Sequence, residues 1–256
     1  MDYTVIDFHT HPFLCEEENI CSHKTFCNMT AESTVSLMKE LGVSRICGSV
    51  IKRGEHTWKL MREQNDSALR LRDLYGDFYI PGFHVHPDFP EESCREIQRM
   101  AGLGVKLIGE LVPYYHGWKD YACENFSLIL DEAEKYGMVV SFHSMGEDEM
   151  DRMVRRHPDT VFVAAHPGEY GEFCRHMERM KLSRNYYLDL SGYGIFRHGM
   201  LRHAIDLFGA ERFLYGSDYP TCNPAMYLGG VALDPLITEA EKNAILHRNV
   251  EKLLGL

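Results

Sequence analysis

The stretch TVIDFHTH, residues 4–11, is the segment from which the fold of this chain can first be read. Its β-branched, apolar and aromatic side chains before the first histidine predict a buried strand. Residues two apart share a face of a strand, so the imidazoles of His9 and His11 can reach one ion. On a helix the two rings would point about 200° apart, because each residue turns by about 100°. The motif therefore predicts a pair of metal ligands only if the segment is a strand.

Seven more runs of this kind follow, separated by segments of helical periodicity. We expect strands at residues 4–8, 45–51, 78–85, 105–111, 138–143, 161–166, 186–190 and 212–216. We expect helices at residues 31–41, 56–74, 91–101, 123–136, 148–156, 168–181, 197–208 and 238–253, the last opened by a Thr238/Glu241 capping box. This alternation predicts an α/β fold, a (β/α)8 TIM barrel, as a single domain over residues 1–256. The rival, an open doubly wound sheet, would carry a glycine-rich phosphate loop after its first strand, and the sequence has none there.

Composition and charge narrow the class of protein. The chain of 256 residues is 45% hydrophobic, enough for one substantial core, and its net charge of -11 disfavours nucleic acid as a partner. Its 8 cysteines include no C-x-x-C pair, which is typical of free thiols in a reducing compartment. We find neither a signal-peptide pattern nor an apolar run long enough to span a membrane, so we expect a cytoplasmic protein with no membrane partner.

Ligand-type residues end five of the expected strands, and in a barrel the carboxyl ends of the strands carry the chemistry. These residues are His9, His11, Glu110, His143, His166 and Asp218. Three or four nitrogen and oxygen ligands with an open position suit a catalytic zinc, and histidine with carboxylate also suits manganese. The set is larger than one tetrahedral ion needs. It therefore predicts either two ions that share Glu110 or one ion with free residues acting as acid and base.

These residues resemble the amidohydrolase superfamily of metal-dependent barrel enzymes. Its pattern is His-x-His after strand one, Lys or Glu after strand four, His after strands five and six, and Asp after strand eight. Four segments look like its amidohydrolase 2 subgroup: DFHTHP at 7–12, VAAHPG at 163–168, YLDLSG at 187–192 and LYGSDYP at 214–220. That subgroup includes decarboxylases, hydratases and lactone hydrolases that act on small carboxylated compounds. The segment IGEL at 108–111 is instead similar to the strand-four glutamate of TatD-type barrel hydrolases.

The resemblance implies a role for each residue. In a two-ion centre, His9, His11 and Asp218 would bind the more buried ion. Glu110 would bridge to a second ion, completed by His143 and His166. In a one-ion centre, as in the mononuclear members, the ligands would be His9, His11, His143 and Asp218, and His166 would be free to act on the substrate. In both cases Asp218 is the expected proton acceptor for a metal-activated water.

Two features near these ligands keep alternative readings. Glu110 can instead form an ion pair with Lys106, four residues earlier on the expected strand face. A second His-x-His, at His84 and His86, follows strand three, where the family pattern has no ligand. We expect these two imidazoles at the rim or as hydrogen-bond partners of the ligands, because metal-bound imidazoles need a partner for their other nitrogen.

Three loops are candidates for substrate recognition. The loop after strand one carries Cys15, Cys21, Cys27 and His23, which suggests either a small zinc site or reduced thiols in a lid. After strand four, the run VPYYHGW at 112–118 places Tyr114 on the same rim, where it can contact substrate. After strand seven, Arg197 is either a clamp for a substrate carboxylate or a solvated charge at a helix start.

The sequence thus favours a metal-dependent hydrolase that uses a metal-activated water on an amide, lactone or ester-like bond of a small molecule. One or two divalent ions are expected, zinc first and manganese as the alternative. The competing reading is a mononuclear decarboxylase or hydratase acting on a small unsaturated or aromatic carboxylic acid, and Glu110 separates the two. An inactive barrel would lack ligands, and none is missing. A homo-oligomer is possible, but no residue pattern specifies it.

Overall fold

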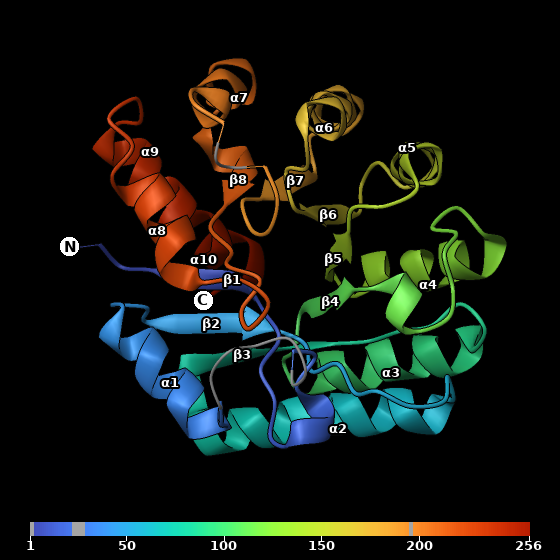
Figure 1. The fold of residues 1–256 in the computed structure, drawn as a ribbon. Coiled ribbons are helices and arrows are strands. Elements are labelled where there is room, and N and C mark those ends of the chain that lie inside the picture. Colours follow the sequence, from blue (N-terminus) through green and yellow to red (C-terminus); the bar gives the residue numbers. More distant parts are fainter. Residues whose placement is uncertain (1–2, 22–28, 195–196) are drawn as a thin grey trace.

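The computed structural model describes residues 3–21, 29–194 and 197–256, which form a barrel of eight parallel strands (Figure 1). Neighbouring strands pair in chain order from β1 to β8. Three backbone hydrogen bonds close the ring: the Phe8 N–H donates to the Tyr215 carbonyl at 2.9 Å, the Asp218 N–H to the His9 carbonyl at 2.8 Å, and the His11 N–H to the Tyr219 carbonyl at 2.7 Å. The strands are β1 (Ile6–Thr10), β2 (Arg45–Gly48), β3 (Tyr79–Phe83), β4 (Leu107–Leu111), β5 (Val139–His143), β6 (Val161–Ala165), β7 (Tyr186–Asp189) and β8 (Phe213–Leu214).

Helices follow the strands and lie outside the ring (Figure 1). They are α1 (Ala31–Glu40), α2 (Trp58–Tyr75), α3 (Pro90–Gly102), α4 (Glu124–Lys135), α5 (Glu147–Arg156), α6 (Tyr170–Leu182), α7 (Met200–Phe208), α8 (Pro224–Ala232), α9 (Glu239–Asn243) and α10 (Asn249–Leu254). Short turns are η1 (Glu16–Glu18), η2 (Gly76–Phe78), η3 (Pro113–Tyr115), η4 (Ala210–Arg212) and the π turn η5 (Ala244–Arg248). The (β/α)8 barrel predicted from the alternating pattern is therefore confirmed.

The core has two layers, because alternate residues of each strand face opposite sides of the sheet. The inner layer fills the barrel with one or two side chains from most strands, among them Ile6, Cys47, Leu107 and Val163. Residues of α10 join this inner cluster beside the first residues of β1, β4 and β5. The helix therefore covers the end at which the strands begin, and leaves the other end for a site.

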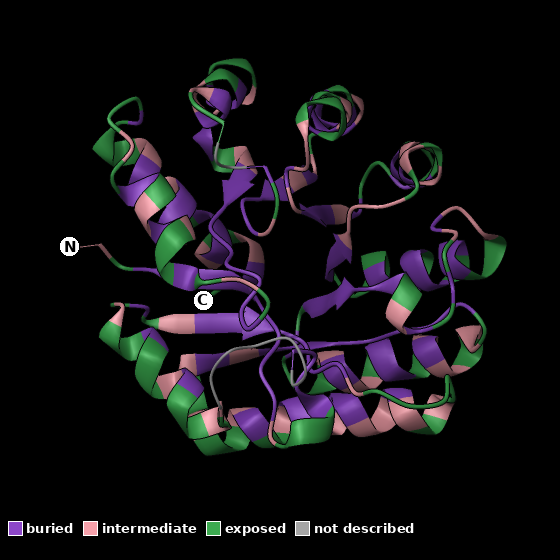
Figure 2. Ribbon diagram, in the orientation of Figure 1, coloured by how far each residue is buried: buried purple, intermediate pink, exposed green. Residues whose placement is uncertain are grey.

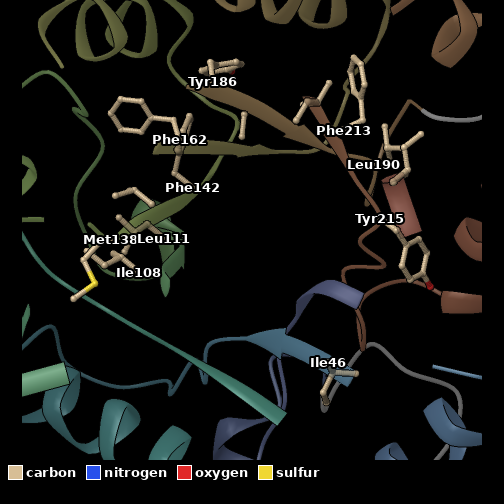
Figure 3. Packing of buried hydrophobic residues seen from close by; sticks show 14 of the residues in the cluster. Ile46, Ile108, Leu111, Met138, Phe142, Phe162, Tyr186, Leu190, Phe213 and Tyr215 are labelled. Carbon is tan, nitrogen blue, oxygen red and sulfur yellow. The ribbon is translucent and has the colours of Figure 1, made fainter. Parts of the chain in front are cut away.

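The outer layer lies between the strands and the helices and contains most of the buried aromatic residues. Figure 2 shows the strands mostly buried, whereas the helices are exposed on the side that faces away from them. Phe142 of β5 packs with its ring centroid 5.9 Å from that of Phe162 and 6.4 Å from that of Tyr186 (Figure 3). These rings contact across three neighbouring strands, so the outer layer holds the strands in register.

Three local predictions need correction. The first strand begins and ends two residues later than predicted, because its pairing continues to Thr10. The helix α8 was not predicted, since Gly229 and Gly230 interrupt its pattern and Pro224 at its start reads as a turn signal. The predicted helix 238–253 is helical from Glu239 onward and has the expected Thr238/Glu241 capping box, but its middle, Ala244–Arg248, has the π pattern that separates α9 from α10. Within the described residues, no helix is both long and apolar enough to cross a membrane.

Candidate metal centre

The six predicted ligand residues converge at the carboxyl ends of the strands. Their ligand atoms form two groups, each lying within 4.8 Å: one is His9, His11 and Asp218, and the other is Glu110, His143 and His166. The Nε2 atoms of His9 and His11 are 3.2 Å apart. Side chains from β1, β4 and β5 and from the segments after β6 and β8 therefore meet in one place.

Glu110 belongs to the second group and also faces the first, with one carboxylate oxygen toward the histidines of each. Its Oε2 is 3.1 Å from the Nε2 atoms of both His9 and His11. Its Oε1 is 3.0 Å from His143 Nδ1 and 3.6 Å from His166 Nε2. Asp218 completes the first group, with its Oδ1 3.6 Å from His9 Nε2 and 3.5 Å from His11 Nε2. The Glu110 carboxylate can therefore contribute one oxygen to each group at the same time.

The predicted alternative, an ion pair between Glu110 and Lys106, is wrong. Lys106 is exposed, and its ammonium lies beside Gly255 at the other end of the barrel. The strand register shifts between Ile108 and Leu111, so the two residues do not share a face as strict alternation predicts. Gly109 makes this irregularity possible: its φ is +90°, and a Cβ there would lie 2.1 Å from the Ser141 carbonyl oxygen.

A second register shift directs the His-x-His motif into the barrel. Ile6 and Phe8 belong to the inner layer, so a strict period of two would send His9 and His11 toward the helices. The pairing of β1 with β2 shifts between Asp7 and Thr10, and both imidazoles face the centre. The prediction that the two rings share a face holds, but the bulge decides which face it is.

His166 and Asp218 reach the centre by a different device. They are the two non-glycine residues with positive φ in the described chain, at 70° and 57° respectively. Such conformations are uncommon for residues with a side chain and gather at functional sites, where the surrounding structure holds them. Each follows the end of its strand, so a local turn aims the side chain inward.

The hydrogen bonds behind the ligands come from residues to which the sequence pattern assigned no role. Asp189, the last residue of β7, is fully buried, and its Oδ2 accepts from His9 Nδ1 at 2.9 Å. The Ser49 carbonyl lies 3.4 Å from His11 Nδ1. Each contact engages Nδ1 and leaves Nε2 of that histidine facing the centre, where it can bind an ion once deprotonated. A polar residue at the end of β7 was the available signal for Asp189.

The second His-x-His does not supply these partners. His86 Nε2 lies 2.8 Å from the His116 carbonyl, and the His84 ring packs edge-on against His116, with centroids 4.7 Å apart. All three rings are buried. Burial and the charge of His11 lower the pKa of His84 to about 3, so this imidazole is neutral at neutral pH. Within the described residues neither the His84 nor the His86 imidazole is hydrogen-bonded to a ligand, so the predicted role as partners of the ligands is wrong.

Opposing effects set the charge states within the centre. Burial raises the pKa of Glu110, but the charge of His9 and hydrogen bonds from the histidines hold it well below its usual range. Burial lowers the pKa of His9, yet Glu110 and Asp189 raise it well above normal. For His166 burial prevails and its pKa is lowered. The carboxylates thus create a negative field that holds protons on His9 and would equally attract a cation.

The residues present fit a divalent cation. Glu110, Asp189 and Asp218 are exposed by 3%, 0% and 8% respectively, and in the described part of the chain their ion-pair partners are histidines only. Buried carboxylates without lysine or arginine need another positive charge. The histidine nitrogens and carboxylate oxygens are donor types that suit zinc and manganese.

A cavity of about 160 Å³ opens above the centre. Its floor contains five of the six ligand-type residues, His9 being the exception, and its wall is mainly apolar or aromatic: Ile20, Cys21, Ile51, Val112, Tyr114, Tyr115 and Thr221. The Tyr114 ring packs edge-on against His143, with centroids 5.2 Å apart, so Tyr114 lies where it was predicted. Burial and the charge of Glu110 raise the pKa of the Tyr114 hydroxyl, which is therefore neutral.

Two substrate-side predictions fare differently. Arg197 forms an exposed ion pair with Glu169 and does not line the cavity, so the structure favours the surface reading over a carboxylate clamp. Of the predicted cysteine site, Cys15 is exposed whereas Cys21 is buried in the cavity wall. Cys27 and His23 lie outside the described residues, so the zinc reading of this loop stays untested.

Comparison with known proteins agrees with the fold. A family model described as Amidohydrolase matches residues 6–256. No curated protein matches the chain. The chain is similar to the structure of 2,6-dihydroxybenzoate decarboxylase from Rhizobium, with 15% identity, a TM-score of 0.76 and 99% of each chain covered. It is also similar to a manganese-bound dihydroxybenzoic acid decarboxylase from Polaromonas sp. JS666, with 16% identity, a TM-score of 0.71 and coverage of 99% of this chain and 97% of that one.

A hydrolase is among the similar structures as well. It is a probable 2-pyrone-4,6-dicarboxylic acid hydrolase from Acinetobacter baumannii, with 15% identity, a TM-score of 0.69 and coverage of 99% of this chain and 100% of that one. At such low identity these structures establish a shared fold and leave the reaction open.

Proposed function

The chain belongs to the amidohydrolase family, and from this premise we propose that it is a metal-dependent hydrolase that cleaves an amide, lactone or other ester-like bond of a small molecule. Zinc is the proposed metal, and manganese is the alternative. The observation that carries the proposal is the position of Glu110, whose two oxygens face two separate groups of ligand atoms. Such a carboxylate suits a bridge between two ions, as in the resembling hydrolases.

The residues divide into two sets in this proposal. His9, His11 and Asp218 would hold the more buried ion, and His143 with His166 would hold the second. When bound, the ions supply Lewis-acid chemistry, polarising the scissile carbonyl and lowering the pKa of a water molecule. Asp189 and the Ser49 carbonyl keep the first two imidazoles oriented through their Nδ1 atoms.

Asp218 is the proposed proton acceptor. Its carboxylate lines the cavity beside His9 and His11, so it is within reach of both water and substrate. In hydrolysis, Asp218 accepts a proton from the attacking water and can return it to the leaving nitrogen or oxygen. The carbonyl carbon gains one bond to the water oxygen and loses its bond to the leaving group. No other proton carrier is required.

The cavity wall supports a small substrate with an uncharged body. Within the described residues, no lysine or arginine lines the cavity, and the lining includes Ile51, Val112 and Tyr114. A substrate carboxylate would therefore have only the metal centre as a positive partner. An aromatic or lactone ring can pack against Tyr114, and this supports the assignment of that residue to substrate binding.

A mononuclear lyase is the second candidate. It is favoured by the two similar structures whose names are those of dihydroxybenzoate decarboxylases. In this reading a small unsaturated or aromatic acid binds through its carboxylate, and His166 is free to act as an acid on the ring carbon. His166 suits that role in one respect, since it lines the same cavity as Asp218.

The test combines metal content with product analysis. Purified protein loaded with zinc or manganese is offered a panel of small amides, lactones and esters, and released carbon dioxide is measured in parallel on unsaturated and aromatic acids. We expect hydrolysis in the panel and about two ions per chain. Asp218→Asn should retain the fold and at least one ion but lose turnover at least about a hundredfold, the lower range for loss of a general base.

Asp206→Asn is the matched control, because Asp206 is a well-exposed carboxylate that pairs with Arg202 on α7. This variant should hydrolyse the panel at the wild-type rate. Normal turnover by Asp218→Asn with metal bound would exclude the proton-acceptor role. Carbon dioxide release by the wild type without any hydrolysis, together with one ion per chain, would establish the lyase reading instead.

A further inference from the structure

The Ser191 hydroxyl connects the two halves of the candidate metal centre. Ser191 is fully buried in the segment after β7, and its Oγ lies 2.9 Å from His9 Nδ1 and 3.0 Å from His166 Nδ1. The same hydroxyl donates to Asp189 Oδ1. His9 belongs to one group of ligand atoms and His166 faces Oε1 of Glu110 in the other. One hydroxyl therefore contacts imidazoles from both groups.

The number of protons available fixes the direction of these bonds. An ionised carboxylate only accepts, so the single Ser191 hydroxyl proton is donated to Asp189. The Ser191 oxygen then has only lone pairs left for the imidazoles and accepts from His166 Nδ1–H. His9 Nδ1–H donates to Asp189 Oδ2 at 2.9 Å. This pattern occupies both Nδ1 atoms and leaves both Nε2 atoms on the side of Glu110, with His9 Nε2 3.1 Å from Oε2 and His166 Nε2 3.6 Å from Oε1.

Two glycines make room for this contact. Gly192 has a φ of +60°, and a Cβ built there would lie 2.2 Å from His166 Nδ1. At Gly216, a Cβ would lie 2.8 Å from His9 Cβ and 3.3 Å from Ser191 Cβ. Any side chain at either position would displace an imidazole from the serine. The packing is therefore specific to an arrangement in which Ser191 reaches both histidines.

We propose that Ser191 is a positioning residue that sets the Nδ1–H tautomer of His166. Because Ser191 and His9 both bond Asp189, Ser191 also couples the orientation of His166 to that of His9. The proposal rests on the proposed function, because it concerns residues of the same centre. His9 keeps Asp189 as its own acceptor. His166 has Ser191 as the acceptor for its ring Nδ1–H, so removal of the hydroxyl acts on the two halves unequally.

Ser191→Ala tests the proposal with two measurements. Nitrogen-15 NMR of histidine-labelled, metal-free protein at pH 8 reports the tautomer of His166. Competition with a chromophoric chelator then gives the affinity for each zinc ion. We expect the Nδ1–H form in the wild type and a mixture with the Nε2–H form in the variant. The weaker zinc affinity should fall about 10–100-fold, the usual effect of losing a hydrogen-bond partner behind a ligand, and the tighter one by less than threefold.

Ser93→Ala is the matched control, since Ser93 is an equally buried serine whose hydroxyl, among the residues that the structure describes, bonds only the backbone of His86. It should change neither the tautomer nor either affinity. Asp189→Asn should weaken the binding of both ions, because Asp189 accepts hydrogen bonds from both His9 and Ser191. An unchanged His166 tautomer in Ser191→Ala, or equal losses at both ions, would overturn the coupling by Ser191.

The same assignment can be tested without a substitution. If Ser191→Ala does not fold, the wild-type spectrum decides, because an Nε2–H tautomer of His166 contradicts the hydrogen-bond directions given above. If the wild type binds a single ion, the two-ion function fails. The tautomer of His166 in the wild type and in Ser191→Ala still decides the role of Ser191, so the two failures are distinguishable.

Discussion

Replacing Glu110 by glutamine is the sharpest test of the two-ion centre. The substitution keeps the size of the side chain but exchanges one carboxylate oxygen for an NH2 group and removes a negative charge. In the wild type, Oε2 contacts the Nε2 atoms of His9 and His11, and Oε1 contacts His143 Nδ1, all at 3.0–3.1 Å. A glutamine can present an acceptor oxygen to one group only. Its NH2 group would face the other group, where it repels a cation.

The magnitude follows from the charges. A divalent ion and a carboxylate separated by about 4 Å attract each other by about 8 kcal/mol at an effective dielectric constant of about 20. The carboxylate also loses hydration in this buried site, which offsets a large part of that attraction. If only a third remains, the loss is about 2.7 kcal/mol, or a hundredfold in affinity for one ion. We therefore expect the metal content of Glu110→Gln to fall by about one ion per chain.

The assay is metal analysis by mass spectrometry after dialysis against a weak chelator, with circular dichroism to confirm the fold. Glu96→Gln is a suitable control, because Glu96 is also buried but pairs with Arg99 and Arg62 on the outside of the barrel. Its metal content should equal that of the wild type. An unchanged stoichiometry in Glu110→Gln would refute the bridging role and return the centre to one ion.

Three further tests, made with five substitutions, address other parts of the structure. Arg197→Ala should change KM less than twofold, since Arg197 pairs with Glu169 at the surface. Tyr114→Ala should lower kcat/KM at least tenfold, because Tyr114 lines the cavity. Equal effects of the two variants in a steady-state assay would contradict the assigned cavity wall. Gly192→Ala should lower the free energy of unfolding by at least about 1 kcal/mol in urea titrations, while Gly171→Ala, where a Cβ meets nothing within 4 Å, should be neutral or stabilising. His84→Leu should make the free energy of unfolding less sensitive to acid. The pKa of His84 is about 3 in the folded chain and about 6.5 in the unfolded chain, so the unfolded chain takes up a proton first. The wild type therefore loses stability as the pH drops below about 6.5. Between pH 7 and 5.5 the wild type should lose about 1 kcal/mol more than the variant, and identical pH profiles would show that His84 is not neutral in the folded state.

Much of the barrel could be predicted from periodicity alone. Each expected strand is present, because a buried parallel strand needs a short run of apolar residues and the runs differ clearly from the helical segments between them. Helix α8 escaped prediction because its sequence, PAMYLGGVA, combines a proline start with two glycines. Its boundaries depend on packing against the barrel rather than on intrinsic propensity.

The sequence by itself determined which residues stand near the carboxyl ends of the strands, since chain order and strand count place them there. It did not determine where their side chains point. His143 follows the plain alternation of β5, but His9, His11 and Glu110 face the centre only because β1 and β4 shift register, and His166 and Asp218 do so through positive φ. A shift of one residue moves every later side chain to the opposite face, so no period-two pattern can foresee it. The partners Asp189 and Ser191 depend on a contact between β1 and the end of β7, about 180 residues apart in the chain, which closure of the barrel creates.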